Sequence, residues 1–452
     1  MIRTVTTSLE TSLSVLCLGS DGLVLDESLT SAPSMSSSAF NQEEICLSNL
    51  GAIRSNPGQY LWNLRLPSAD EMLRELEAVL ELPESLSSST SCKVVIHSSC
   101  PTSRDREPLS RLAARLEKKN IMVVTGVLPS DCQGSSTPET MATDLVHKLK
   151  FGVEVSSPGP TSGTLPELPG PTSALVPLKM ERIGMGFLGL VDLPALRGGI
   201  SEEEGKRLEG VLLKAMGMAS RLCQGVPIFL TTHDVWGQEA FSESRALSII
   251  DGVHAGGAKH APIVFCRCPC HVHLLRSYAA ILKYDDQVHL SFSFHGNAFY
   301  ASPTAALASE VASDEEGARL VSLLCEEGFA SRILLSHTIT CRLKLQKYGG
   351  FGYTHLPQHI LPRLLRLGVS PSDLARVGGG NMRRLLAWWR PPPPVEKPVE
   401  IGTCSWCKAA FEVRENAYFS KFAYVYCTSR CLSAHGDTGW KALDDSERKP
   451  PG

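Results

Sequence analysis

The chain has 452 residues, of which 43% are hydrophobic and 20% charged, and its formal net charge is -3. This length predicts more than one domain, and the composition is typical of a globular protein with a large core. The near balance of charge gives no electrostatic case for binding to nucleic acid or to a membrane surface.

The amino terminus has no sustained apolar run that would indicate a signal peptide. No segment approaches the roughly 20 apolar residues of a membrane span. We therefore expect the protein to act in the cytoplasm, or in the nucleus as well. In that setting its 15 cysteines are reduced thiols or metal ligands rather than disulfides.

The first elements fall in residues 13–29, which contain two short apolar runs, around Val15-Leu16 and Leu23-Val24-Leu25. Gly19-Ser20-Asp21-Gly22 separates the runs, and the pattern predicts a hairpin whose second run becomes a first buried strand. An amphipathic helix follows, with Met72, Leu73, Leu76, Val79 and Leu80 at helical spacing.

Strands and helices then alternate along the chain. Strands are predicted at 92–97 and 121–125, and helices at 109–116 and from Thr137-Pro138 onward. Apolar runs predict five more strands, at 183–190, 226–230, 263–265, 288–294 and 333–335. Capping boxes begin two of the later helices, Ser201 with Glu204 and Ser313 with Glu316. This alternation predicts a parallel sheet wrapped in helices.

Two segments of unusual composition interrupt the pattern. Residues 156–173, SSPGPTSGTLPELPGPTS, predict a disordered insertion. Four prolines at 391–394 predict an extended linker over 391–400, after the last of these elements.

A glycine-rich loop follows the last strand and ends in Lys347 to His355 (KYGGFGYTH). Together with Gly368 to Leu374 (GVSPSDL) and Gly380-Asn381 before Arg384-Leu385-Leu386, it resembles the end of a phosphotriesterase-related amidohydrolase. The resemblance covers about residues 10–389 and is most specific at the carboxy-terminal end. It implies a TIM-type (β/α)8 barrel over residues 1–390, whose chemistry lies in the loops after the strands.

In that family the barrel holds two metal ions that lower the pKa of a bridging water. The residues here that match the family's metal ligands are Asp26, Ser28, Leu190, Thr231, Arg267 and Thr338. Leu190 cannot bridge two metals, and Arg267 places a cation where a cation should bind. We expect the fold to be kept and the binuclear centre to be lost. A two-residue shift would restore His233 on the fifth strand, which leaves a rearranged hydrolase site as the alternative.

Three other groups of residues are candidates for metal binding, nucleophilic catalysis or phosphate binding. Five ligands of the kind that zinc or copper prefers follow the sixth strand: Cys266, Cys268, Cys270, His271 and His273. Core and loop packing is the simpler interpretation, because closed zinc sites draw ligand pairs from separate segments. His337 could act as the base for a nucleophilic Thr338 or Cys341. No carboxylate that would orient the histidine is identifiable, so a loop hydroxyl and a hydrogen-bonded histidine are the simpler interpretation. The glycine-rich loop lacks the residue spacing of a phosphate-binding P-loop, so we interpret it as a structural part of the barrel.

The strong metal signal lies after the linker. Cys404 and Cys407 form C-x2-C, and Cys427 and Cys431 form C-x3-C nineteen residues later. Two thiolate pairs suit one tetrahedral structural zinc, and the pattern resembles treble-clef fingers of the MYM and TRASH kind. The second pair should open a helix after Tyr424-Val425-Tyr426. We expect a four-cysteine zinc finger over 401–440 with Tyr418, Phe419, Phe422, Tyr424 and Tyr426 as its core, and a disordered tail over 441–452.

The sequence therefore predicts a non-catalytic amidohydrolase-like barrel joined to a zinc finger. Residues 400–452 carry seven basic and seven acidic side chains, so a protein partner is favoured over nucleic acid. The alternative is a zinc-dependent hydrolase that uses Asp26, His233 and the cysteine and histidine group after the sixth strand.

Overall fold

A computed structural model of the chain divides into two compact units, Met1–Trp389 and Arg390–Gly452, which are described separately. The structure describes residues 2–3, 8–9, 15–20, 41–55, 57–64, 69–79, 92–97, 106–129, 137–154, 182–193, 201–231, 242–294, 312–337, 339, 341–388, 401–412, 419–421 and 424–439. The predicted insertion at 156–173, the linker at 391–400 and the tail at 441–452 lie outside these residues.

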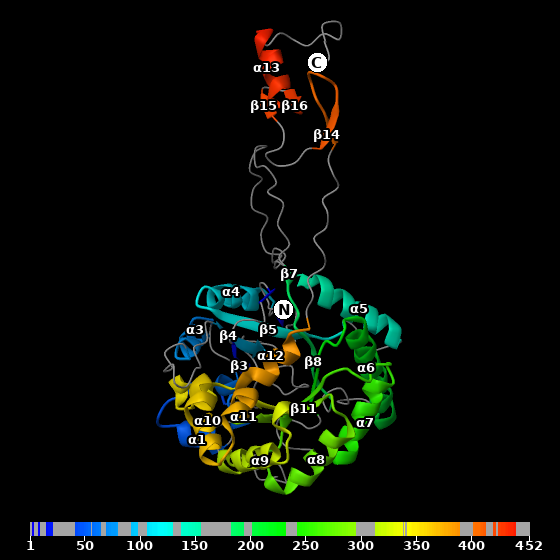
Figure 1. Cartoon of the computed structure of the whole chain (residues 1–452). Helices are drawn as coiled ribbons and strands as arrows, with labels where there is room; N and C mark the ends of the chain where they lie inside the picture. Colours follow the sequence, from blue (N-terminus) through cyan, green and yellow to red (C-terminus); the bar gives the residue numbers. More distant parts are fainter. Residues whose placement is uncertain are drawn as a thin grey trace. The chain divides into compact units, whose positions relative to one another are not determined.

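Eight parallel strands close into a barrel at the centre of the first unit (Figure 1). In chain order they are β3 (Val15–Ser20), β4 (Cys92–His97), β5 (Ile121–Val127), β8 (Phe187–Asp192), β9 (Ile228–Thr231), β10 (Ile263–Cys268), β11 (Val288–Ser293) and β12 (Ile333–Ser336). The pairing of Ser336 with Gly19 joins the last strand to the first. This topology confirms the predicted (β/α)8 barrel.

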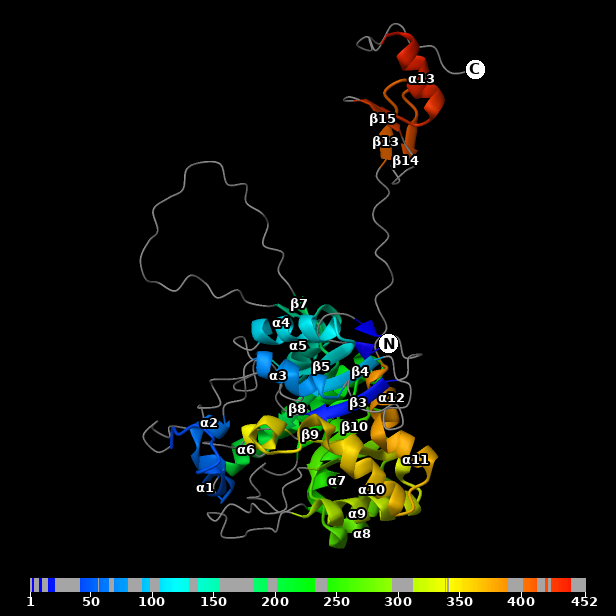
Figure 2. The same cartoon turned by 90° about the vertical axis from the view of Figure 1, so that its left-hand side faces the viewer.

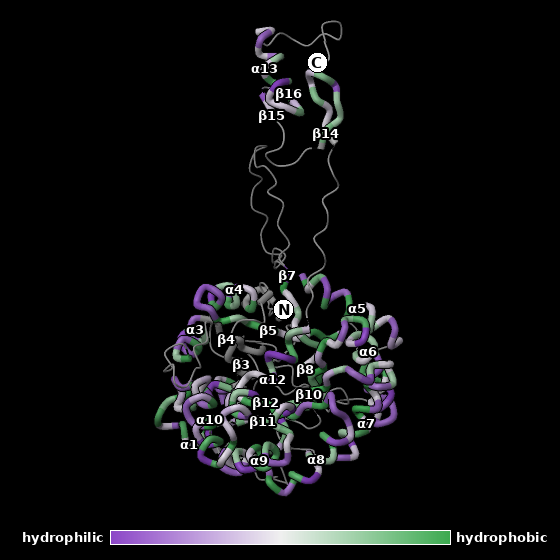
Figure 3. The backbone as a smooth tube through the Cα atoms, viewed as in Figure 1, coloured by the Kyte–Doolittle hydropathy of each residue, from purple (hydrophilic) through white to green (hydrophobic). Residues whose placement is uncertain are grey.

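Helices surround the barrel, and in Figure 3 they alternate between hydrophobic and hydrophilic residues along their length. The principal ones are α3 (Ala69–Glu77), α4 (Arg106–Glu117), α5 (Pro138–Phe151), α6 (Glu202–Leu222), α7 (Glu243–His254), α8 (Leu275–Tyr284) and α9 (Asp314–Glu326). Their apolar faces are buried against the strands, as the spacing of Met72 and Leu76 and of Leu109 and Leu112 predicted. Ser201 and Ser313 cap α6 and α9 as expected.

The start of the barrel differs from the prediction. The first barrel strand is Val15–Ser20, and the antiparallel pair that precedes it is β1 (Ile2–Arg3) with β2 (Ser8–Leu9), so the expected hairpin at 13–29 was wrong. Gly19 pairs with Ile96 inside the sheet instead of turning the chain. A glycine after an apolar run can either turn the chain or continue the strand. The sequence pattern does not distinguish the two, and only closure of the barrel decided between them.

The carboxy-terminal family motif closes the bottom of the barrel. Helix α12 (Asn381–Leu386) follows α10 (Leu361–Arg366) and α11 (Pro371–Ala375). Its residues Met382, Leu385 and Leu386 pack on the side chains that fill the barrel interior, Val124, Phe187, Phe229, Val264 and Leu334. Asn381 Nδ2 donates to the carbonyl oxygens of Ala330 and Ile333 at 2.8 and 2.7 Å, which fixes α12 at the start of β12.

Between β3 and β4 the chain forms α1 (Leu50–Ser55), α2 (Leu61–Leu64) and α3, and Figure 2 shows α1 and α2 together beside the barrel. A short antiparallel pair, β6 (Val153–Glu154) with β7 (Arg182–Ile183), flanks the insertion. Within the described residues, no helix combines the length and the apolar character needed to cross a membrane.

The second unit is small. Two antiparallel pairs, β13 (Ile401–Thr403) with β14 (Ala410–Glu412) and β15 (Phe419–Lys421) with β16 (Tyr424–Tyr426), precede α13 (Ser429–Asp437). The helix follows Tyr424-Val425-Tyr426, as the sequence predicted, and it begins at Ser429.

Candidate functional site

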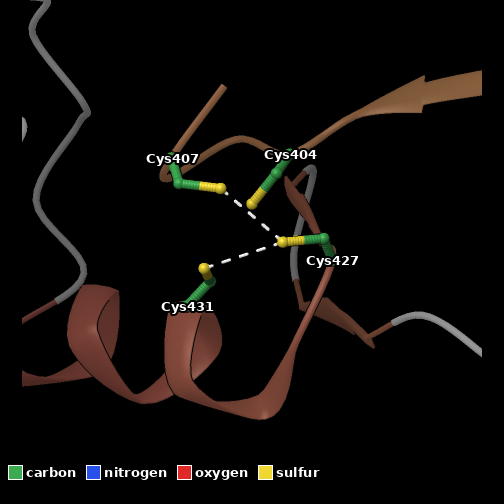
Figure 4. Close-up of side chains that lie close together, drawn as sticks. All are labelled: Cys404, Cys407, Cys427 and Cys431. Atoms are coloured by element: carbon green, nitrogen blue, oxygen red, sulfur yellow. Dashed lines mark hydrogen bonds between the residues drawn. The ribbon is translucent and has the colours of Figure 1, made fainter. Parts of the chain in front are cut away.

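Four cysteines of the second unit point toward one another (Figure 4). Cys404 and Cys407 lie on the turn between β13 and β14, Cys427 follows β16, and Cys431 lies in the first turn of α13. Their Sγ atoms all lie within 4.8 Å of one another, with 3.6 Å between Cys407 and Cys427 and 3.8 Å between Cys427 and Cys431. Sulfurs that converge from two separate segments are the arrangement of a closed tetrahedral zinc site.

Backbone hydrogen bonds hold the two halves of this site in place. Cys404 N donates to Ala409 O at 2.9 Å, and Lys408 N donates back to Cys404 O at 3.0 Å, which tightens the turn. Ser405 ties that turn to β16, because its N–H donates to Val425 O at 2.7 Å and its hydroxyl accepts from Val425 N at 3.0 Å. Thr428 caps α13 by accepting from Cys431 N, which orients the fourth thiol.

The thiols of this group have opposite tendencies to ionise. Burial opposes the ionisation of Cys404, but the surrounding backbone N–H groups outweigh it and lower its pKa to about 7. Burial, and then hydrogen bonds to the neighbouring thiols, raises the pKa of Cys427 to about 12. A first thiolate at this spacing makes the next one costly to form, and a bound dication removes that cost.

The aromatic core around the cysteines differs in part from the expected one. Tyr426 is fully buried and its hydroxyl lies 2.6 Å from Nδ1 of the buried His435, while Tyr424 packs edge-on against the same ring. Phe419 is 43% exposed, so its assignment to the core was wrong. Tyr418 and Phe422 lie outside the described residues. No sequence pattern had indicated that this core would be completed by Trp406, Phe411, Leu432 and His435.

Three of the positions that the sequence resemblance matches to the family's metal ligands lie within the described residues of the first unit. Leu190 packs against the apolar interior of the barrel. Thr231 is fully buried, and its hydroxyl donates to Val191 O of the neighbouring strand at 3.5 Å. Arg267 lies at an irregularity of β10 with φ of 58°. Asp26, Ser28, His233 and Thr338 lie outside the described residues.

The five cysteine and histidine residues at the end of β10 and directly after it are divided among three environments. Cys266 packs against the barrel interior. Cys268 and Cys270 are buried between the barrel and its helices, where burial raises the pKa of Cys268 well above its usual value and that of Cys270 to about 12. His271 and His273 lie on the surface side of this loop, where they meet Glu316 of α9. The donor atoms of the two histidines and Glu316 lie together, and this group includes none of the three cysteines.

Two histidines on the loops above the barrel face carboxylates at the start of α9. His271 Nδ1 lies 3.4 Å from Glu316 Oε1, and His355 Nε2 lies 2.6 Å from Asp314 Oδ2. Each acid is distant from its histidine along the chain, and the sequence identified Glu316 only as a helix-capping residue. His337 is also buried, and its Nε2 accepts from Leu356 N at 3.4 Å. Cys341 packs in a separate apolar cluster with Ile53 and Leu343.

The glycine-rich loop binds the segment between β3 and β4. Gln346 N donates to Glu75 Oε1 at 2.8 Å, and Lys347 and Tyr348 both contact Glu71. Gly352 has φ of +60°, and a Cβ there would overlap the Glu75 carboxylate. The glycines therefore let the loop pack closely on α3, which accords with the architectural interpretation.

Replacing Gly352 with Ala should lower the free energy of unfolding by about 2–4 kcal/mol, because the left-handed backbone and the overlap with Glu75 both penalise a side chain. Urea unfolding followed by circular dichroism measures the change. Gly368→Ala is the matched control: Gly368 also has a positive φ, of +95°, but a Cβ there meets no atom within 4 Å. Equal effects of the two changes would contradict the role of the close approach.

A closed barrel of eight parallel strands and a separate four-cysteine module define a TIM-barrel protein with a treble-clef finger. The family comparisons give each part a more specific identity. The phosphotriesterase family model matches residues 218–386, and the model of the Vms1-associating treble clef domain matches residues 399–442. The chain is therefore similar to the phosphotriesterase family over residues 218–386 and to a treble clef domain over residues 399–442.

The curated relatives match over short stretches. A phosphotriesterase-related protein of Nematostella vectensis is 35% identical over 79 residues, 18% of this chain and 23% of its own. The N-acetyltaurine hydrolase of Homo sapiens is 39% identical over 64 residues, 14% of this chain and 18% of its own. The chain thus matches less than a quarter of the length of these relatives.

Solved structures share the barrel over a much longer range. A resiniferatoxin-binding protein from Rhodobacter sphaeroides has a TM-score of 0.62 and 21% identity, and the match covers 85% of this chain and 94% of that one. The phosphotriesterase homology protein from Escherichia coli, with phosphate in its active site, has a TM-score of 0.52 and 15% identity over 84% of this chain and all of that one. At these identities the likeness establishes the fold alone.

Proposed function

We propose that this protein is a non-catalytic member of the phosphotriesterase-related group, a barrel scaffold whose treble clef finger binds one structural zinc through Cys404, Cys407, Cys427 and Cys431. The finger provides the contact to a protein partner. The observation that carries the proposal is Leu190, which packs into the barrel interior at the position that matches the family's bridging ligand.

Two other positions matched to the family's metal ligands support the loss of the binuclear centre. Thr231 uses its hydroxyl within the sheet, and Arg267 places a guanidinium at the end of β10. Two divalent cations held close together need carboxylates and imidazoles to balance their charge. An apolar side chain and a fixed cation at matching positions oppose such a pair.

The finger supports a binding role. The matching domain model is named for association with another protein. Phe419 exposes 43% of its surface on β15, and a partly exposed aromatic ring is a common anchor in protein interfaces. The balance of seven basic and seven acidic residues in 400–452 supports a protein partner over nucleic acid.

The second candidate is a metal-dependent hydrolase with a rearranged site. The names of the relatives favour it, since several are N-acetyltaurine hydrolases. In this alternative His233 and Asp26 would supply ligands at the end of the barrel, together with the histidines after β10.

The two functions differ in turnover. Purified full-length protein, supplied with Zn2+ or Mn2+, should hydrolyse neither esters, lactones nor N-acylated amino acids faster than buffer does, because no bridging group is available to activate a water. Product formation is followed by chromatography, with an active phosphotriesterase-family enzyme as the positive control. Metal-dependent turnover that disappears in His233→Ala would establish the hydrolase.

A further inference from the structure

Three potential metal ligands meet near the surface of the barrel unit. His271 and His273 belong to the loop between β10 and α8, and Glu316 belongs to the first turn of α9. Their donor atoms all lie within 4.8 Å of one another. His271 and Glu316 are partly buried and His273 is exposed, so the group is open to solvent on one side.

The spacing suits a shared cation. Zinc binds imidazole nitrogen and carboxylate oxygen at about 2.0–2.2 Å, which places two tetrahedral ligands about 3.4 Å apart. His271 Nδ1 and Glu316 Oε1 lie 3.4 Å apart. The rings of His271 and His273 are stacked with centroids 5.2 Å apart, which brings a second imidazole beside the first. An ion pair with Glu316 requires only one imidazole, whereas a metal uses both.

The surrounding contacts hold these ligands in position. Glu316 Oε1 accepts the Val272 N–H at 3.1 Å, so the carboxylate is bound to the loop between the two histidines. Ser313 caps α9 by accepting from Glu316 N at 3.1 Å. A Cβ on Gly317 would lie 3.0 Å from Cys270 Cβ and 3.1 Å from Phe294, so the first turn of α9 packs tightly on the loop. Carboxylate orientation by a backbone donor is typical of metal-site surroundings.

We propose that His271, His273 and Glu316 bind one borderline divalent cation, zinc above all, on the barrel unit and independently of the finger. The three ligands leave a fourth coordination position open to solvent. The two imidazoles and one carboxylate are the donor types that select zinc, nickel or copper over magnesium or calcium. The site differs from the positions that match the family's binuclear centre, and it uses none of the three cysteines of the same segment.

Titration of the full-length, tag-free chain with Co2+ tests the proposal while the finger keeps its zinc. We expect one equivalent of Co2+ to bind, with weak visible absorption and without the strong near-ultraviolet bands of cobalt thiolate. Isothermal titration calorimetry gives the affinity. His273→Ala and Glu316→Gln should each weaken Co2+ binding by about 100-fold or more, since loss of an outer contact alone costs about 10–100-fold. His260→Ala removes an exposed imidazole elsewhere and should change nothing.

Each outcome is decisive. Absence of the cobalt equivalent overturns the site, as does its retention with unchanged affinity in both variants. Thiolate absorption would place the added cobalt on cysteine sulfur, in the finger or at the buried thiols before His271, and would also overturn it. If Glu316→Gln disturbs α9, its melting temperature will be lower than that of the unchanged chain. In that case His273→Ala, at an exposed residue, decides the test. A bound ion without turnover leaves the scaffold function in place, so the two proposals can fail separately.

Discussion

A chain in which Ser replaces Cys404 should lose its zinc and the fold of its second unit, while the barrel unit remains folded. Cys404 is fully buried and is one of the four converging thiols, and a hydroxyl is a poor zinc ligand. A finger of this size has too small an apolar core to fold without metal. Zinc binding to such modules contributes about 10–16 kcal/mol at neutral pH, so folding and metal binding are lost together.

Elemental analysis in metal-free buffer measures the first effect. We expect Cys404→Ser to contain about one zinc per chain less than the unchanged protein, with the barrel's melting transition preserved. Cys46→Ser is the matched control, because Cys46 is an exposed cysteine of the first unit. Capture of a protein partner should also be lost, since it depends on the folded finger. Zinc that remains at full occupancy in Cys404→Ser would refute the four-thiolate site.

The second large effect is expected from Phe229→Ala inside the barrel. Phe229 is 2% exposed, and its ring lies 4.4 Å from that of Phe187, centroid to centroid, above the side chains of α12. Removing it leaves a cavity that the rigid strands cannot fill by collapsing. The free energy of unfolding should fall by about 3–5 kcal/mol.

Urea unfolding of the barrel unit measures this loss. Phe151→Ala deletes the same side chain at a position that is 57% exposed, and it should change stability by no more than about 0.5 kcal/mol. If the two variants unfold at the same urea concentration, the barrel interior is not the close-packed core described here. Zinc content should be the same in both, because neither residue belongs to the finger.

Much of the architecture could be predicted from local sequence. Buried strands are continuous apolar runs, and helices show apolar residues at about 3.6-residue spacing, so the alternation that defines a (β/α)8 barrel is visible in the chain. The carboxy-terminal motif after the last strand showed the family resemblance. In the structure, its residues Asn381 and Leu386 help to close the bottom of the barrel. The cysteine spacing predicted the treble-clef module because its two ligand pairs are local motifs.

The sequence by itself determined that there is a barrel and a finger, and it predicts a set of replaced ligand positions. Only the tertiary structure decided which neighbours each side chain has. Residues Val15–Ser20 became the first strand because barrel closure requires that register. His271 and Glu316, far apart in the sequence, meet because parallel strands bring their following loops to one end of the barrel. Cys268 and Cys270 turn into the core while His271 and His273 remain outside, because the irregularity in β10 redirects the chain.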